Sequence, residues 1–116
     1  MDIFFTLDKD KNVIPSTYEN YEIYRKNNPK HVRHNYIKKY GIRISTVFLF
    51  CDHGGEIIDG EYKPLIFETM VFQDNESYEW DDYAERYYTW KEALEGHRKI
   101  TRDVIKFLRQ TKENVL

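Results

Sequence analysis

Cysteine, proline and glycine are scarce in this sequence. Its 116 residues contain one cysteine, three prolines and five glycines. Because Cys51 stands alone, an intrachain disulfide is impossible, and a CxxC metal site is excluded as well. The chain has to be stabilised by a hydrophobic core of its own, and a single free thiol suits a protein of the reducing cytoplasm.

Long hydrophobic runs are also missing. The longest apolar stretch, Val47 to Cys51, has five residues, whereas a membrane-spanning helix needs about 20. The first residues, MDIFFTLDKDK, lack the basic segment that opens a secretion signal. We therefore expect a protein that does not cross a membrane, is not exported and stays in the cytoplasm.

Aromatic residues are abundant instead. The chain has ten Tyr, seven Phe and two Trp, and 41% of its residues are hydrophobic. A chain of this length buries roughly two-thirds of the surface that its unfolded form exposes. No internal repeat or low-complexity segment divides the sequence. We expect one globular domain over residues 1–116, with no cofactor and no metal.

The net charge of −2 hides two blocks of opposite sign. Residues 24–51 contain seven Lys or Arg and no acid, and residues 52–85 contain eleven acids and one base. Such blocks are usually solvated faces, which here could lie near each other. Two alternatives remain open: the basic block contacts nucleic acid, or the acidic block imitates it.

The beginning of the chain predicts a hairpin followed by a short helix. Residues 2–7 and 12–14 are strand-like and flank DKDKN, whose Asp and Asn residues favour a turn. Ser16, with Glu19 three positions later, forms a capping box for a helix that ends near Lys26.

The short helix carries tyrosine at every third position. This spacing of Tyr18, Tyr21 and Tyr24 predicts an aromatic face that packs on a sheet. The sequence NNP at 27–29 ends the helix. Residues 30–41 are basic and without a period, so we expect an irregular segment there.

Two apolar segments predict a long central hairpin. Residues 42–51, IRISTVFLFC, alternate at first and then become apolar on both faces, which is typical of a central strand. Residues 64–72, PLIFETMVF, have the same character. Between them, Asp59-Gly60 is typical of a type I′ hairpin turn.

This turn predicts the register of the hairpin. With Asp59-Gly60 at the tip, Cys51 lies opposite Glu68, and His53 lies opposite Ile66. Because side chains alternate between faces, one face then carries Leu49, Cys51, His53, Ile66, Glu68 and Met70. A bulge at the glycine pair Gly54-Gly55 would place Asp52 on this face instead of His53.

The end of the chain predicts a short strand and a long helix. Residues 83–88 are strand-like, and Thr89 with Glu92 forms a second capping box. The helix that follows has apolar positions three and four residues apart: Trp90, Ala93, Leu94, His97, Ile100, Val104, Phe107 and Leu108. The elements together predict an α+β fold, in which an antiparallel sheet of about four strands is covered by the C-terminal helix and accompanied by the short N-terminal helix.

Ionisable residues within the expected core form a candidate polar cluster of Asp52, His53, Glu68 and His97. Glu68 lies on a buried strand and His97 lies on the apolar stripe of the helix, so each is costly to bury alone. We therefore predict that Glu68 and His97 touch, and that Asp52 or His53 joins them.

Two roles for this cluster remain open. It is either a satisfied structural pair in the core or a polar pocket beside Gly54-Gly55. In a pocket, two His and a carboxylate could hold a divalent metal, or His and Asp could exchange protons. No spaced motif such as H-E-x-x-H supports either chemistry.

Three segments, RISTVFLFCDH, PLIFETMVF and ERYYTWKEALEGH, resemble recurring blocks of a protein family. In this ordered series the chain is similar to small, mostly uncharacterised proteins encoded by bacteriophages and prophages. The resemblance implies a phage-type accessory protein of one domain in the host cytoplasm and carries over no enzymatic activity. Asp52, His53, Glu68, Tyr87 and His97 lie inside the matching blocks. The acidic segment 73–82 and the C-terminal extension depart from the pattern.

Three classes of function follow from these observations. The class we favour is a binding protein that acts on a host or phage macromolecule, with a protein preferred over nucleic acid, as an inhibitor of host or antiviral-defence machinery. The alternatives are a small hydrolase or nuclease that uses the candidate polar cluster, and a structural protein that self-associates. For binding, the candidate interface combines residues of both charge blocks: Arg33, Lys38, Lys39, Tyr78, Trp80, Asp81 and Asp82.

Overall fold

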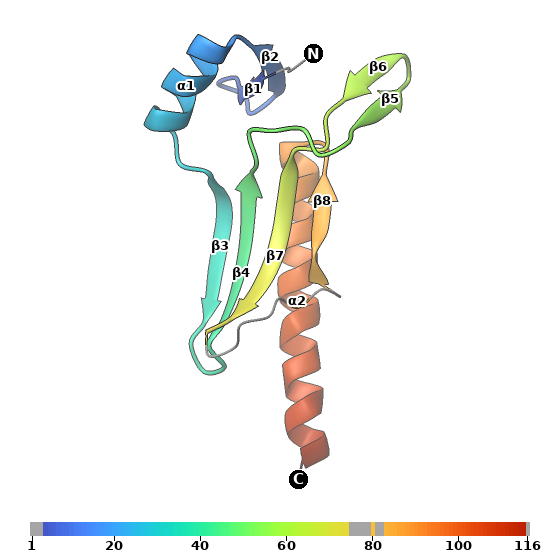
Figure 1. The fold of residues 1–116 in the computed structure, drawn as a ribbon. Helices are drawn as coiled ribbons and strands as arrows, with labels where there is room; N and C mark the ends of the chain where they lie inside the picture. The colour runs from blue at the N-terminus through green and yellow to red at the C-terminus, as the bar shows by residue number, and fades with distance from the viewer. Residues whose placement is uncertain (1–3, 75–79, 81–82, 116) are drawn as a thin grey trace.

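The structure is a computed structural model that describes residues 4–74, 80 and 83–115. In these residues the chain forms eight strands and two helices (Figure 1). In chain order they are β1 (Phe4–Leu7), β2 (Val13–Ser16), α1 (Tyr18–Asn27), β3 (His31–Ile37), β4 (Ile42–Phe48), β5 (Glu56–Ile58), β6 (Glu61–Lys63), β7 (Phe67–Gln73), β8 (Glu85–Tyr87) and α2 (Trp90–Val115). The predicted α+β class is confirmed.

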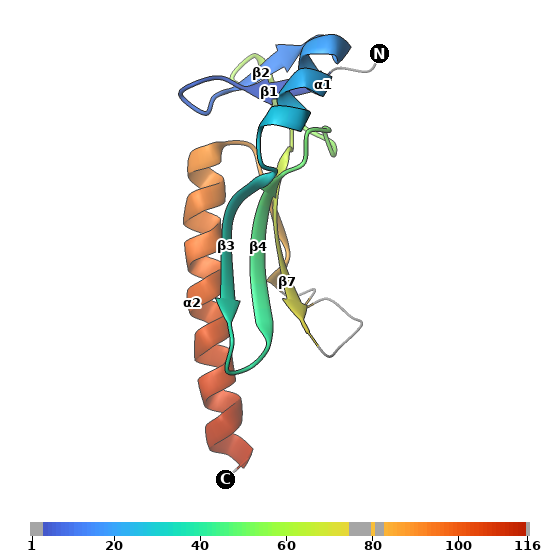
Figure 2. The ribbon, with the colours of Figure 1, turned by 90° about the vertical axis from the view of Figure 1, so that its left-hand side faces the viewer.

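The centre of the fold is an antiparallel sheet with the strand order β3-β4-β7-β8. The two predicted central strands, β4 and β7, do lie in its middle. Figure 2 shows α2 along one face of the sheet, and no described helix or strand lies against the other face. Alternate residues of β4 and β7 are buried beneath α2: Ile42, Ile44, Thr46, Phe48, Phe67, Thr69 and Val71.

The pairing of β4 with β7 is displaced by four residues from the predicted register. Val47 lies opposite Glu68, where the sequence predicts Cys51. The connection between the strands accounts for the difference, because seven residues separate β4 from β5 while only three separate β6 from β7. The prediction assumed one continuous hairpin. The unequal connections divide it into two hairpins, β4 with β7 and β5 with β6, whose registers differ.

The tip of the predicted hairpin is correct and forms a small hairpin of its own. Glu56 of β5 lies opposite Lys63 of β6, in the predicted register. Asp59 and Gly60 have φ angles of 52° and 81°, which the predicted type I′ turn requires. β5 and β6 extend beyond the main sheet (Figure 1).

The glycine pair Gly54-Gly55 lies between strands and not in a bulge of the sheet. Gly54 adopts a φ angle of 101°, which favours glycine. A Cβ atom on Gly55 would lie 2.0 Å from the carbonyl oxygen of Lys63. The pair therefore allows the loop after β4 to approach the end of β6 closely.

The N-terminal hairpin and helix form as predicted, with a shift of one residue in the cap. The carboxylate of Asp8 accepts a hydrogen bond from the N–H of Asp10 at 2.8 Å and organises the turn between β1 and β2. The helix α1 is capped by Thr17, which accepts from the N–H of Asn20 at 3.2 Å. Ser16, the predicted cap, ends β2 instead.

The tyrosines of α1 pack on an aromatic cluster at the end of the sheet. Tyr21 lies against Phe4 and Phe50, and Tyr24 also contacts Phe50. Tyr18 touches Phe4 but stays 58% exposed. The predicted aromatic face is therefore present, although α1 sits beyond the end of the sheet and not on the face that α2 covers (Figure 1).

The segment expected to be irregular contains the edge strand β3. Its residues pair with β4, with Asn35 opposite Ile44, and a bulge lies between His31 and Arg33. Most side chains of β3 are exposed. An edge strand of this kind lacks the alternation of apolar residues that marks a half-buried strand, so it has no period to detect.

The long helix α2 begins as predicted, and its predicted stripe is buried or half-buried except at Phe107, which is 44% exposed. The N–H of Glu92 donates to Oγ1 of Thr89 at 3.1 Å, as expected for the cap. Ala93, Ile100 and Val104 of the predicted stripe are buried. Within the part of the chain that the structure describes, no helix combines the length and the apolar character that a membrane crossing requires.

A close approach between α2 and β8 provides a test of this packing. Gly96 is buried, and a Cβ atom there would lie 2.2 Å from the ring and hydroxyl of Tyr87, which is itself held by Thr69. We expect Gly96→Ala to lower the free energy of unfolding by about 1 to 3 kcal/mol through overpacking, although alanine usually favours a helix. Urea denaturation measures the change. Glu95→Ala, at an exposed neighbouring position, is the control and should stay within about 0.5 kcal/mol. A Gly96→Ala variant as stable as the parent would contradict this packing.

Candidate functional site

A chain of hydrogen bonds crosses the buried interface between α2 and the sheet. His97, which is 1% exposed, places Nδ1 at 2.7 Å from Oγ1 of Thr46 on β4. Its Nε2 lies 2.6 Å from Oδ1 of Asn35 on β3. Oγ1 of Thr46 lies 2.5 Å from Oγ1 of Thr69 on β7, which accepts from the hydroxyl of Tyr87 on β8 at 3.1 Å. We refer to these five residues as the polar relay, and it joins α2 to all four strands of the sheet.

The polar relay has a consistent direction of donation. The hydroxyl of Tyr87 donates to Thr69, so the hydroxyl of Thr69 is free to donate to Thr46. Thr46 then donates to Nδ1 of His97. Because the amide oxygen of Asn35 can only accept, the neutral ring of His97 must carry its proton on Nε2, which makes Nδ1 the acceptor from Thr46. With His97 neutral, each side chain of the relay has a hydrogen-bond partner.

Burial keeps His97 neutral. It is the main reason that the pKa of His97 falls from 6.5 to about 4, and repulsion by Arg33 and His34 adds to the effect. Both ring nitrogens already have hydrogen-bond partners. His97 therefore has no nitrogen left for a metal or a substrate unless the relay breaks.

The predicted contact between Glu68 and His97 is wrong. Glu68 lies on the face of β7 that α2 leaves open, and its Oε2 accepts from Nε of Arg86 on β8 at 2.7 Å. His97 contacts the opposite face, which carries Thr46. That face also carries most of the buried apolar residues of β4 and β7, on either side of Thr46 and Thr69, and the stripe of α2 covers it.

Asp52 and His53 lie in the loop between β4 and β5, away from the polar relay. The carboxylate of Asp52 accepts from the N–H groups of the glycine pair and of Leu65 at 3.0 to 3.1 Å, and from the hydroxyl of Tyr62. Burial alone would raise the pKa of Asp52, but these hydrogen bonds hold it below its usual value. Asp52 organises the loop, and His53 is exposed.

The candidate polar cluster is therefore divided among three places: the polar relay, the open face of the sheet and the loop after β4. Among the residues that the structure describes, no three His, Cys, Asp or Glu side chains come together to hold a metal ion. The His and carboxylate chemistry of the predicted hydrolase or nuclease is not assembled by these four residues.

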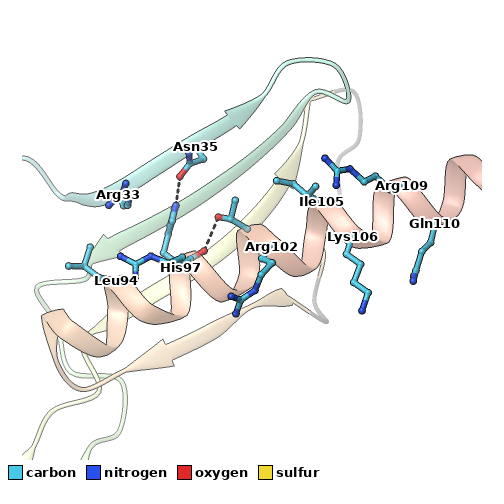
Figure 3. A pocket seen from close by; sticks show the side chains of 11 residues that line it. Arg33, Asn35, Leu94, His97, Arg102, Ile105, Lys106, Arg109 and Gln110 are labelled. Carbon is cyan, nitrogen blue, oxygen red and sulfur yellow. Dashed lines mark hydrogen bonds between the residues drawn. The ribbon is translucent and has the colours of Figure 1, made fainter.

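The structure brings together a different set of charged residues, in a groove between β3 and α2 (Figure 3). The groove has a volume of about 520 Å³, and Arg33 and Asn35 form its wall on the sheet side. Among the described residues its lining contains five exposed cationic side chains and no acidic one: Arg33, Arg98, Arg102, Lys106 and Arg109. We call this feature the basic groove.

Helical spacing arranges three cations of α2 in a row. Arg98, Arg102 and Lys106 follow each other at intervals of four residues along the helix. Figure 3 shows Arg102 and Lys106 on the side of α2 away from β3, and Arg109 on the side of β3. The half-buried Leu94 and Ile105 also line the groove. The basic groove therefore combines aliphatic surface with a row of positive charge.

Only part of the predicted basic interface belongs to this groove. Arg33 lines it. Lys38 and Lys39 lie in the turn that joins β3 to β4 and are not part of the lining, and Lys39 sits over the ring of Tyr40 at 5.5 Å.

The predicted acidic and aromatic half of the interface is described only at Trp80. Its ring is partly buried against Tyr83 and Phe107, and its indole N–H donates to Gln73 at 3.2 Å. Trp80 thus packs against its own chain. Three further predicted residues lie outside the described residues: Tyr78, Asp81 and Asp82.

Among the described residues, one salt bridge joins the two charge blocks, on the open side of the sheet. Nε of Arg43 lies 2.9 Å from Oδ1 of Asp74, and the hydroxyl of Tyr36 donates to Oδ2 of Asp74 at 2.7 Å. The guanidinium of Arg43 also stacks over the ring of Tyr36 at 4.2 Å. This contact agrees with the expectation that the two blocks lie near each other.

The partners of His97 and the cations of α2 were not predicted from the sequence. One available signal was Thr46, which occupies the position after Ile42 and Ile44 where alternation calls for an apolar residue. The other signal was the interval of four residues between Arg98 and Arg102, which Lys106 repeats one turn further along the helix. Neither signal could show which strand lies beside that flank.

Comparisons with known proteins do not assign the chain to a family. No family model, curated protein or solved structure matches it.

The neutral His97 makes stability depend on pH. Between pH 6.5 and 4 the unfolded chain binds a proton at His97 that the folded chain does not, so acidification through this window favours unfolding. We expect His97 to account for a loss of at most about 3 kcal/mol over the window. Urea denaturation at several pH values measures it.

The matched variants are His97→Gln and His53→Gln. His97→Gln should remove this part of the pH dependence, whatever its effect on stability at pH 7. His53→Gln changes an exposed histidine and should keep the dependence of the parent. A His97→Gln variant with the slope of the parent would show that His97 is not buried in its neutral form.

Proposed function

We propose that this protein is a binding protein that holds an acidic segment of another protein in the basic groove. The observation that carries this proposal is the set of five cationic side chains, with no acidic one among the described residues, around a groove of about 520 Å³. Four of the five are arginines. The planar guanidinium of arginine matches a carboxylate with two parallel hydrogen bonds.

The cations of the groove are uncompensated within the described residues. Other cations of the chain have partners, such as Arg43 with Asp74 and Arg86 with Glu68. None of the five groove cations is in a salt bridge with a described residue. A row of unpaired positive charge beside a concave surface raises the local concentration of an acidic ligand.

The lining favours a polypeptide over a nucleic acid. Recognition of single-stranded nucleic acid relies on aromatic side chains that stack on the bases. Among the described residues the groove lining contains no Phe, Tyr or Trp, and it contains Leu94, Ile105 and the amide of Asn35. Aliphatic side chains and carboxylates of a peptide suit such a surface.

The resemblance to phage-encoded proteins directs the search for the partner to host and phage proteins. On this proposal the protein is a phage-type accessory protein, and it inhibits a component of host or antiviral-defence machinery by occupying its acidic segment. A hydrolase or nuclease receives no such support, because Asp52, His53, Glu68 and His97 lie in separate places.

A charge-reversal pair tests the groove. The probe is a fluorescent peptide of about 12 residues in which glutamate alternates with valine. We expect the full chain to bind it, more weakly as salt rises, and Arg98→Glu with Arg102→Glu to weaken binding by at least about tenfold. Fluorescence anisotropy measures the affinity.

The control pair is Lys91→Glu with Lys99→Glu, which makes the same charge change on exposed positions of α2 outside the groove. It should weaken binding by no more than about threefold, because separated surface charges are screened. Equal losses for the two pairs would show diffuse attraction and no groove site. Tighter binding of single-stranded DNA or RNA than of the peptide would make nucleic acid the partner.

A further inference from the structure

We infer that the acidic segment binds as an added β-strand along the outer edge of β3, with every second side chain over the basic groove. This inference rests on the proposed function and deepens it, because it names the conformation and the side-chain pattern of the partner. The observations that carry it are the free edge, its position beside the groove and its charge.

The outer edge of β3 is open. β3 is the outermost strand of the sheet, and no strand in the described part of the chain pairs with its outer side. Figure 2 shows β3 in front, with this edge towards the viewer. The backbone groups on the outer side of such a strand can pair with an extended peptide.

The edge and the basic groove form one continuous surface. Arg33 and Asn35 belong to β3 and at the same time form the wall of the groove (Figure 3). A strand added beside β3 would lie about 4.8 Å from it, with alternate side chains on the side of α2. The backbone would then be held by the strand and its side chains by the helix.

The spacings of strand and helix match along this surface. Alternate residues of a strand are about 6.8 Å apart, and residues four apart on a helix are about 6 Å apart along its axis. Figure 2 shows α2 running alongside β3. Acidic side chains of the strand would therefore repeat at about the same interval as the turns of α2, whose cations Arg98 and Arg109 line the groove.

Charge excludes the most obvious competitor, a second copy of this chain. Residues 30–39 contain four Lys or Arg, two His and no acid. Pairing of β3 with another β3 would place like charges opposite each other, which destabilises a sheet. An acidic strand would instead be attracted by the Lys and Arg side chains at the same positions.

The face of β3 that points away from α2 determines which side chains suit the remaining positions of the partner. His31 lies opposite Val47, and the bulge that follows it turns Arg33 to the side of α2. The rings of His31 and His34 lie 5.7 Å apart, and Tyr36 is 44% exposed. Apolar side chains of the partner would lie beside these rings, so the expected pattern alternates acidic and apolar residues.

Backbone methylation of the probe peptide tests the inference on the intact protein. Two versions of the alternating glutamate and valine peptide carry N-methyl groups, one on every glutamate and one on every valine. A strand turns only one of these sets of N–H groups towards β3. We expect one version to lose at least about tenfold in affinity and the other to stay within about threefold of the parent peptide.

The outcomes separate this inference from the proposed function. If both methylated peptides bind like the parent peptide, strand addition is wrong while the groove remains the binding site. If the parent peptide does not bind at all, the proposed function fails and this inference fails with it. Self-association of the protein that the peptide does not displace would assign the edge to a second copy and overturn the inference.

Discussion

The hydrogen bonds of the polar relay determine how α2 lies on the sheet. Hydrophobic attraction has no direction, so apolar contacts alone permit any placement that buries the stripe of the helix. The relay separates two apolar clusters, one with Phe48 and Phe67 and one with Ile44 and Val71. Sliding α2 along the sheet would leave buried polar groups unpaired, at about 1 to 3 kcal/mol for each group. This penalty favours a single alignment.

The same alignment creates the basic groove. Asn35 bonds to His97, so the edge strand β3 is tied directly to α2 beside the groove. Arg98 follows His97 in the sequence, and Arg102 and Lys106 follow Arg98 at intervals of four residues. Arg33 in turn helps to lower the pKa of His97, after the larger effect of burial. The buried relay and the basic groove are therefore linked through α2. His97 fixes the helix against the sheet, and Arg98, the next residue, lines the groove.

Local features of the sequence predicted the elements that depend on near neighbours. Thr89 caps α2, Asp59-Gly60 makes the tight turn, and the centre of the apolar stripe of α2 is buried as its period indicates. The α+β class follows from these elements. The edge strand β3 was missed because exposed positions such as Arg33 and Asn35 carry no apolar pattern, and its existence depends on pairing with β4.

The sequence by itself determined that the chain has a hairpin, a short aromatic helix, two apolar central strands and a long amphipathic helix, because residues within a few positions of each other specify caps, turns and periods. The tertiary structure alone decided the rest. The unequal connections around β5 and β6 set the register of β4 and β7, and the burial of the larger apolar row put Glu68 on the open face and His97 against Thr46. These outcomes depend on contacts between residues far apart in the chain, for which spacing carries no information. The basic groove is of this kind, since Arg33 and Arg98 become neighbours only when α2 lies beside β3.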